Sequence, residues 1–130
     1  MRTCLFVVVL ALAPMLGGCA TIQNIESAIS FATGASVTPQ QVVIAINAFD
    51  AVEGTATVYL RLPYCGAPAA LVCKDKATAG TIITWVRAGR VDRNTLKAAL
   101  RANPAANLTL VDVYNDLSSL TSQIAALARR

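Results

Sequence analysis

The stretch from residue 38 to residue 63, "TPQQVVIAINAFDAVEGTATVYLRLP", predicts a long helix and, through it, the fold class. Thr38 is a hydroxyl N-cap, Pro39 takes the first helical position, where no N–H is needed, and Gln41 stands at the reciprocal capping-box position. Pro63 ends the helix. Between these signals apolar residues recur every three or four positions and predict one buried stripe: Val42, Ala45 or Ile46, Phe49, Val52, Ala56 and Tyr59.

A second helix is predicted from Lys76 to about Asn103, with Asp75 as its N-cap. Gly89 could instead break this helix, in which case Asp92 or Asn94 would cap a new one. The continuous helix gathers its apolar residues into a single arc: Ile82, Trp85, Gly89, Leu96, Ala99 and Leu100.

A third long helix is predicted from about Thr109, which with Asp112 forms a T-x-x-D start. A short amphipathic helix over residues 20–33 either docks on the domain or lies against a bilayer. Three long helices and one short N-terminal helix predict an all-α fold, a small antiparallel helical bundle.

The first nineteen residues, "MRTCLFVVVLALAPMLGGC", are typical of a bacterial secretion signal. Arg2 precedes an apolar run over residues 5–16, which at 12 residues is shorter than the roughly 20 that a membrane span needs. The run ends in "LGGC" at residues 16–19, which resembles the lipobox of bacterial lipoproteins. That resemblance implies cleavage before Cys19, a diacylglycerol on its sulfur and a third acyl chain on its amine. An N-terminal membrane anchor with an incidental cysteine is the alternative.

The residue after Cys19 is Ala20. In enterobacterial lipoproteins an Asp at that position retains the protein in the inner membrane, so the resemblance implies the periplasmic face of the outer membrane, with the inner membrane as the alternative. The expected organisation is a signal peptide at 1–18, a lipid-anchored short helix and linker at 19–37, and a helical domain at 38–130. No run of 18 apolar residues follows Cys19, which predicts no further membrane span.

Two cysteines remain after Cys4 leaves with the signal and Cys19 takes lipid. Cys65 and Cys73 are expected to form a disulfide in an oxidising compartment. Their bond would close a nine-residue ring in the turn between the first two long helices and would contribute roughly 2 to 3 kcal/mol. A redox or metal-binding pair is the less favoured alternative, because the chain has no C-x-x-C and no histidine.

Basic residues concentrate on the second long helix. Between Lys74 and Arg101 seven of them stand against Asp75 and Asp92, a local excess of +5 that exceeds the +4 of the whole chain. Five form what we call the basic stripe, on one side of the helix: Arg87, Arg90, Arg93, Lys97 and Arg101. Because the apolar arc already faces the core, packing offers no reason for this alignment. The stripe is therefore a candidate contact surface for anionic envelope components or an acidic protein, the alternative being an ordinary solvated helix face.

No catalytic apparatus is visible in the sequence. The chain lacks histidine, G-x-S-x-G and S-x-x-K. The pairs Asp50–Glu53 and Asp112–Asp116 can each share a helix face, and we interpret both as solvent-facing or salt-bridging rather than as acid–base or cation sites. We expect no enzyme activity, cofactor, metal or small-molecule substrate. We also expect no nucleic acid partner, because the predicted location of the protein is outside the cytoplasm.

Residues 47–75, "NAFDAVEGTATVYLRLPYCGAPAALVCKD", and residues 86–96, "VRAGRVDRNTL", resemble small uncharacterised lipoproteins of alphaproteobacteria and their prophages. The resemblance supports the fold and the address and implies no particular chemistry. The expected function is that of a lipid-anchored, non-enzymatic envelope protein that contacts envelope components or protein partners. The alternative is a phage or prophage accessory lipoprotein that blocks superinfection or assists lysis.

Overall fold

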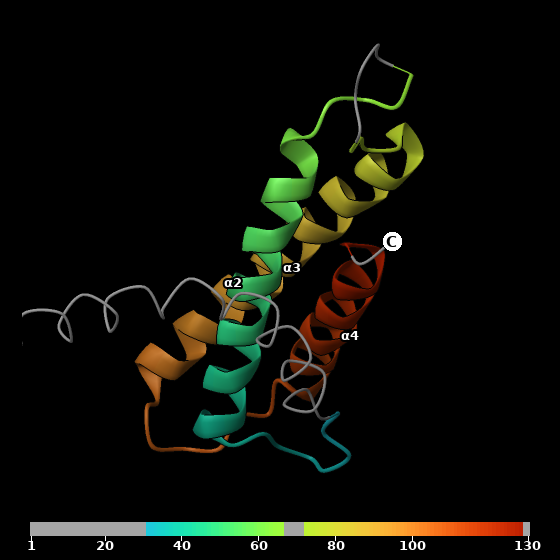
Figure 1. Ribbon diagram of the computed structural model, residues 1–130. Coiled ribbons are helices and arrows are strands. Elements are labelled where there is room, and N and C mark those ends of the chain that lie inside the picture. Colours follow the sequence, from blue (N-terminus) through green and yellow to red (C-terminus); the bar gives the residue numbers. More distant parts are fainter. Residues whose placement is uncertain (1–30, 67–71, 129–130) are drawn as a thin grey trace, which may run out of the picture.

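The structure, a computed structural model, describes residues 31–66 and 72–128. They form three helices, α2 (Pro39–Arg61), α3 (Lys76–Ala102) and α4 (Val111–Ala128), and contain no strand beyond two isolated bridges. The chain runs along α2, returns along α3 and reverses again into α4, so α3 is antiparallel to both neighbours (Figure 1). The predicted all-α bundle of three long helices is confirmed. The predicted short helix over 20–33 falls almost entirely outside the described residues, and its last three residues are not helical.

Helix α2 begins where the capping signals place it. The Gln41 N–H donates to the Thr38 hydroxyl oxygen at 3.2 Å, and the Thr38 N–H donates to Gln41 Oε1 at 2.9 Å. This reciprocal capping box satisfies two backbone donors that the first turn leaves without helical partners. The helix ends at Arg61, directly before Leu62 and Pro63.

Helix α3 runs through Gly89 without a break, so the continuous alternative is the one realised. Gly89 has a packing role. A Cβ at this position would lie 2.2 Å from Phe49 Cε2 and 2.7 Å from Phe49 Cζ. Phe49 is fully buried, and its ring packs directly on the α3 backbone. The glycine therefore lets α2 and α3 approach closely.

Helix α4 packs extensively against both α2 and α3, which contact each other less. It begins at Val111, two residues later than predicted. The core lies among the three helices and consists mainly of aliphatic side chains around two aromatic rings. Its largest fully buried side chains are Tyr114, Phe49, Ile82, Leu96, Leu117 and Ile124.

The segment before α2 belongs to the folded body. Val37, assigned to the linker by the sequence analysis, is fully buried and exchanges two 2.8 Å backbone hydrogen bonds with Leu108, in the loop between α3 and α4. Asn115 of α4 holds the backbone of Ala32, accepting from its N–H at 2.9 Å and donating to its carbonyl at 3.1 Å. The folded body therefore extends at least to residue 32.

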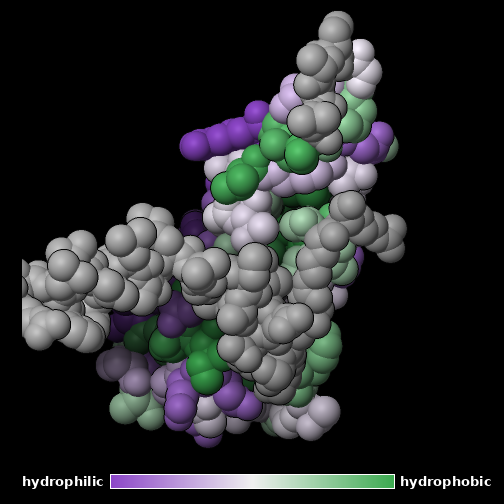
Figure 2. Space-filling model, viewed as in Figure 1, coloured by the Kyte–Doolittle hydropathy of each residue, from purple (hydrophilic) through white to green (hydrophobic). Residues whose placement is uncertain are grey.

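Helix α2 is long and apolar enough to cross a membrane by length and composition alone. Much of that apolar character faces the core, where the stripe from Val42 to Ala56 is buried. Some of it reaches the surface, since Val43 and Val58 are exposed. Figure 2 shows hydrophobic and hydrophilic residues side by side on one face of the molecule. The bundle therefore accounts for the buried stripe of α2, while Val43 and Val58 remain apolar positions on its surface.

Candidate functional site

All five residues of the basic stripe lie on α3, and three of them face carboxylates of α2. Arg90 donates through Nε at 2.7 Å and through Nη2 at 2.5 Å to Glu53 Oε1. Arg93 Nη1 lies 2.7 Å from Asp50 Oδ1 and 3.2 Å from Glu53 Oε2. Lys97 Nζ lies 3.2 Å from Asp50 Oδ2. We call these five residues, Asp50, Glu53, Arg90, Arg93 and Lys97, the ion-pair ladder.

The ladder shows that the expectation of no packing reason for the basic stripe was wrong for three of its five residues. Packing does offer a reason for the alignment of Arg90, Arg93 and Lys97, because antiparallel α2 presents two carboxylates, three residues apart, to them. The interpretation of Asp50 and Glu53 as salt-bridging residues is confirmed. The signal was present in the sequence, since the acidic residues at 50 and 53 match the basic residues at 90, 93 and 97 once the two helices are placed antiparallel.

Arg93 links the ladder to the core. Its guanidinium lies 5.8 Å from the centre of the Phe49 ring, within cation–π range. Burial raises the pKa of Asp50, but hydrogen bonds from Arg93 and Lys97, together with their charges, lower it by more, so the pKa of Asp50 falls below its ordinary value. The ladder therefore holds α2 to α3 most strongly while Asp50 is ionised.

The two remaining residues of the stripe, Arg87 and Arg101, are exposed and form no ion pair within 31–66 and 72–128. The ladder itself opposes three cations with two carboxylates, so it keeps one net positive charge. The stripe thus remains positive after its ion pairs are made, and Arg87 and Arg101 are its two members without an ion pair in the described part of the chain.

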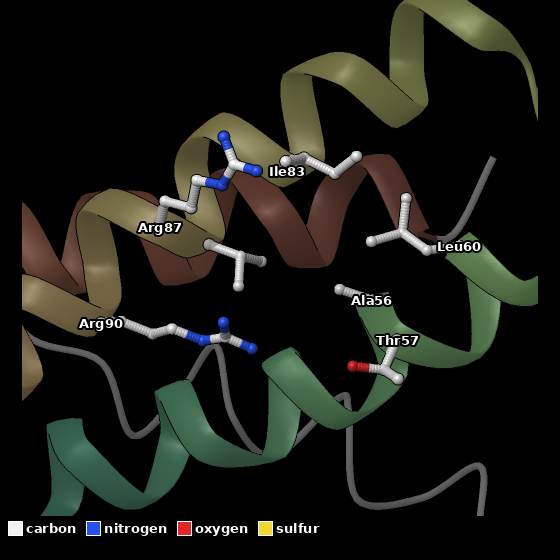
Figure 3. A pocket seen from close by; sticks show the side chains of 7 residues that line it. Ala56, Thr57, Leu60, Ile83, Arg87 and Arg90 are labelled. Atoms are coloured by element: carbon white, nitrogen blue, oxygen red, sulfur yellow. The ribbon is translucent and has the colours of Figure 1, made fainter.

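A hollow of about 270 Å³ opens between α2 and α3 beside the ladder. In Figure 3 Arg87 and Arg90 lie on one side of it, and Ala56, Thr57 and Leu60 on the other. Ile83 and Val86 complete its lining. The hollow therefore combines an apolar lining with two cationic groups.

The turn between α2 and α3 contains the predicted disulfide. Cys65 and Cys73 are bonded, with their Cα atoms 4.9 Å apart. Lys74 Nζ donates to the Leu60 carbonyl and lies 4.6 Å from the centre of the Tyr64 ring. The disulfide thus belongs to a set of contacts that ties the end of α2 to the start of α3.

The second acidic pair has a different environment. Asp112 and Asp116 form no ion pair in the described part of the chain. Burial and the negative charge of Asp116 raise the pKa of Asp92, on the neighbouring helix α3. Among the described residues no three His, Cys, Asp or Glu side chains gather as metal ligands would. Cys19 lies outside those residues.

Comparison of the chain with family models, with curated proteins and with solved structures finds no match.

Proposed function

We propose that this chain is a lipid-anchored, non-enzymatic protein of the periplasmic face of the outer membrane. It is held there through Cys19 and contacts an anionic envelope component or an acidic protein partner. The single observation that carries the contact role is the positive charge left on α3 after its ion pairs are made. Arg87 and Arg101 are exposed and form no ion pair with the described residues, and the ladder, which lies between them in the sequence, keeps one positive charge.

The address rests on the "LGGC" sequence at residues 16–19 behind a charged and then apolar lead. Three acyl chains on Cys19 would hold the protein durably, since stable anchoring needs at least two. The chain from Cys19 to Ala32 would span at most about 45 Å if it were fully extended. The body can therefore reach the membrane surface or partners beside it.

Acylation is tested by Cys19→Ala in cells that incorporate labelled palmitate. The wild type is expected to carry label and to fractionate with the outer membrane, whereas Cys19→Ala carries none and accumulates as precursor or in the soluble fraction. Cys4→Ala is the matched control, because it removes a cysteine that leaves with the signal, and it should be labelled like the wild type. An unlabelled wild type that stays in the membrane would contradict the anchor.

The contact role is tested with charge-matched variants that leave the ladder intact. Full-length protein in nanodiscs of neutral lipid is mixed with nanodiscs of anionic phosphatidylglycerol, and binding is measured at low and high salt. Each cation near an anionic surface contributes about 1 kcal/mol, so Arg87→Gln with Arg101→Gln should weaken binding roughly 30-fold.

Arg61→Gln with Lys76→Gln is the control, since it removes the same charge from the disulfide end. It should bind nearly as the wild type does, and added salt should imitate the loss in the Arg87 and Arg101 variant because exposed charges are screened within about 8 to 10 Å. Equal binding by the two double variants at low salt would contradict the contact role and show that the stripe is an ordinary solvated helix face.

A further inference from the structure

The hollow between α2 and α3 has an apolar floor that is already largely shielded from water. Ala56 on α2 and Val86 on α3 are 1% and 7% exposed. Leu60 and Ile83 form its apolar walls, and Ile83 is 38% exposed. A hydrocarbon group placed here would cover the exposed part of Ile83 and would itself leave water, which is favourable in proportion to the apolar area removed.

Two guanidinium groups of α3 line the hollow, Arg87 beside Ile83 and Arg90 nearer to α2 (Figure 3). Arg87 forms no ion pair with any described residue. Arg90 donates to Glu53 through its Nε and Nη2 edge, which fixes the plane of its guanidinium, and its Nη1 forms no hydrogen bond with the described residues. Because no carboxylate lines the hollow itself, an anion would meet donors there.

The remaining polar group of the lining is already committed. The Thr57 hydroxyl donates to the Glu53 carbonyl at 2.9 Å, so its proton is not available to a ligand. Recognition of an anion therefore depends on Arg87 and on the free side of Arg90. The pairing of a cationic side with an apolar floor suits a ligand that carries one negative charge at the end of a hydrocarbon tail.

The volume limits the size of that ligand. At about 30 Å³ for each group the size of a water molecule, 270 Å³ holds roughly nine such groups. Pockets for drug-sized ligands measure about 300 to 1,000 Å³, so this smaller, half-open hollow would cover a short tail and would leave the paired acyl chains of a phospholipid largely in water. We propose that the hollow binds a short alkyl carboxylate, with its tail on Ala56, Val86, Leu60 and Ile83 and its carboxylate on Arg87 and Arg90.

This inference rests neither on the lipid anchor nor on binding to an anionic surface, although Arg87 takes part in surface binding as well as in the hollow. The probe is hexanoate, which fits the volume, added to full-length protein in neutral nanodiscs. Backbone amide shifts of α2 and α3 report the site. Saturable shifts are expected around residues 56–60 and 83–90, with hexanamide and hexylammonium each binding about tenfold more weakly because they lack the negative charge. Acetate should also bind about tenfold more weakly because it lacks the tail.

The variants separate the carboxylate site from general attraction to α3. Arg87→Gln should weaken hexanoate binding about tenfold, whereas Arg101→Gln removes an equal charge from the same helix outside the hollow and should change it less than about twofold. Ile83→Ser, at a half-exposed position that leaves the core intact, should weaken binding several-fold through the lost apolar wall. Amide spectra of all three variants should otherwise match the wild type.

Three outcomes would overturn the proposal. The first is equal affinity for hexanoate and hexanamide, and the second is an equal loss in Arg87→Gln and Arg101→Gln. The third is an unchanged hexanoate affinity in Ile83→Ser, which would place the tail outside the hollow. Loss of hexanoate binding with nanodisc binding retained would overturn this inference alone and leave the proposed function standing.

Discussion

At Gly89 the helix propensities of glycine and alanine predict one effect of a substitution by alanine, and the packing against Phe49 predicts the opposite. Glycine inside a helix costs about 1 kcal/mol relative to alanine, so a substitution by alanine ordinarily stabilises. Here the added Cβ would lie 2.2 Å from Phe49 Cε2. Phe49 is fully buried under the Arg93 guanidinium, so the ring has no open space into which to move. Gly89→Ala is therefore expected to lower the free energy of unfolding by about 1 to 3 kcal/mol, as overpacking does.

Two other helical glycines supply the comparison. An added Cβ would meet nothing within 4 Å at Gly54 or at Gly80. Gly54→Ala and Gly80→Ala should therefore each raise stability by up to about 1 kcal/mol in denaturant titrations of the three variants. Should Gly89→Ala stabilise as the other two do, the close approach of α2 to α3 at Phe49 would be wrong.

Asp92 is a residue whose ionisation works against the fold. Burial first, and then the negative charge of Asp116, raise the pKa of Asp92, so its ionised form is less favourable in the folded chain than in the unfolded one. Asp92→Asn should therefore increase stability at pH 7, by less than about 1 kcal/mol because solvent screens a partly exposed group.

The sign of the pH dependence follows from the raised pKa of Asp92. As the pH falls through that raised value the folded chain takes up the proton and the cost disappears, so the advantage of Asp92→Asn should vanish near pH 4, the ordinary range of an unfolded aspartate. Asp116→Asn should give a smaller gain at pH 7, and the gains of the two variants should not add. Denaturant titrations from pH 4 to pH 7 measure this. An advantage that persists unchanged at pH 4 would exclude the electrostatic cause.

At the scale of the elements, sequence periodicity predicted each helix but not the lateral contacts between them. Capping residues and prolines fixed the ends of α2 to within one residue, because those signals act on the local backbone. The sequence left open whether α3 breaks at Gly89, because the packing role of this glycine appears only when Phe49 of α2 is placed beside it. The basic stripe could likewise be predicted from the periodicity of α3 alone. Its partners Asp50 and Glu53 could be identified only from the packing of α2 against α3.

The turn between α2 and α3 is held by a disulfide whose loss should lower the stability of the protein. The Cys65–Cys73 bond closes a short ring and restricts the unfolded chain, with a contribution of roughly 2 to 3 kcal/mol. Replacing both cysteines by serine should therefore lower the melting temperature by at least several degrees, at about 4 to 8 °C per kcal/mol for a domain of this size. Hydrogen exchange should accelerate first at the end of α2 and the start of α3.

A control distinguishes this effect from the loss of other contacts in the turn. Tyr64→Ala removes the ring over which Lys74 lies but keeps the disulfide. It should cost much less than the double serine variant. An unchanged melting temperature in the double variant would show that the remaining contacts of Lys74 and Tyr59 hold the turn without the bond.

At the scale of the whole molecule, α4 is the element that makes one core of three helices. It packs on both α2 and α3, while Val37 and Ala32 attach the entering chain to the α3–α4 loop and to α4 itself. Because α4 contacts α2 and α3 more extensively than they contact each other, most of the core depends on α4. We therefore expect the domain to unfold in a single cooperative step, as small domains with one core generally do.

Leu117→Ala tests that cooperativity. Leu117 lies fully buried on α4, so truncation should cost about 2 to 5 kcal/mol, a large share of the 5 to 15 kcal/mol typical of such domains. The single tryptophan, Trp85, reports from α3, on a different helix from the mutation. Its fluorescence and the far-ultraviolet circular dichroism should lose their signals at one shared, lowered midpoint. Leu120→Ala, at a position outside the buried cluster, should shift that midpoint much less. If the dichroism midpoint falls while the Trp85 midpoint stays in place, α4 unfolds on its own, and the hairpin of α2 and α3 must hold a core without it.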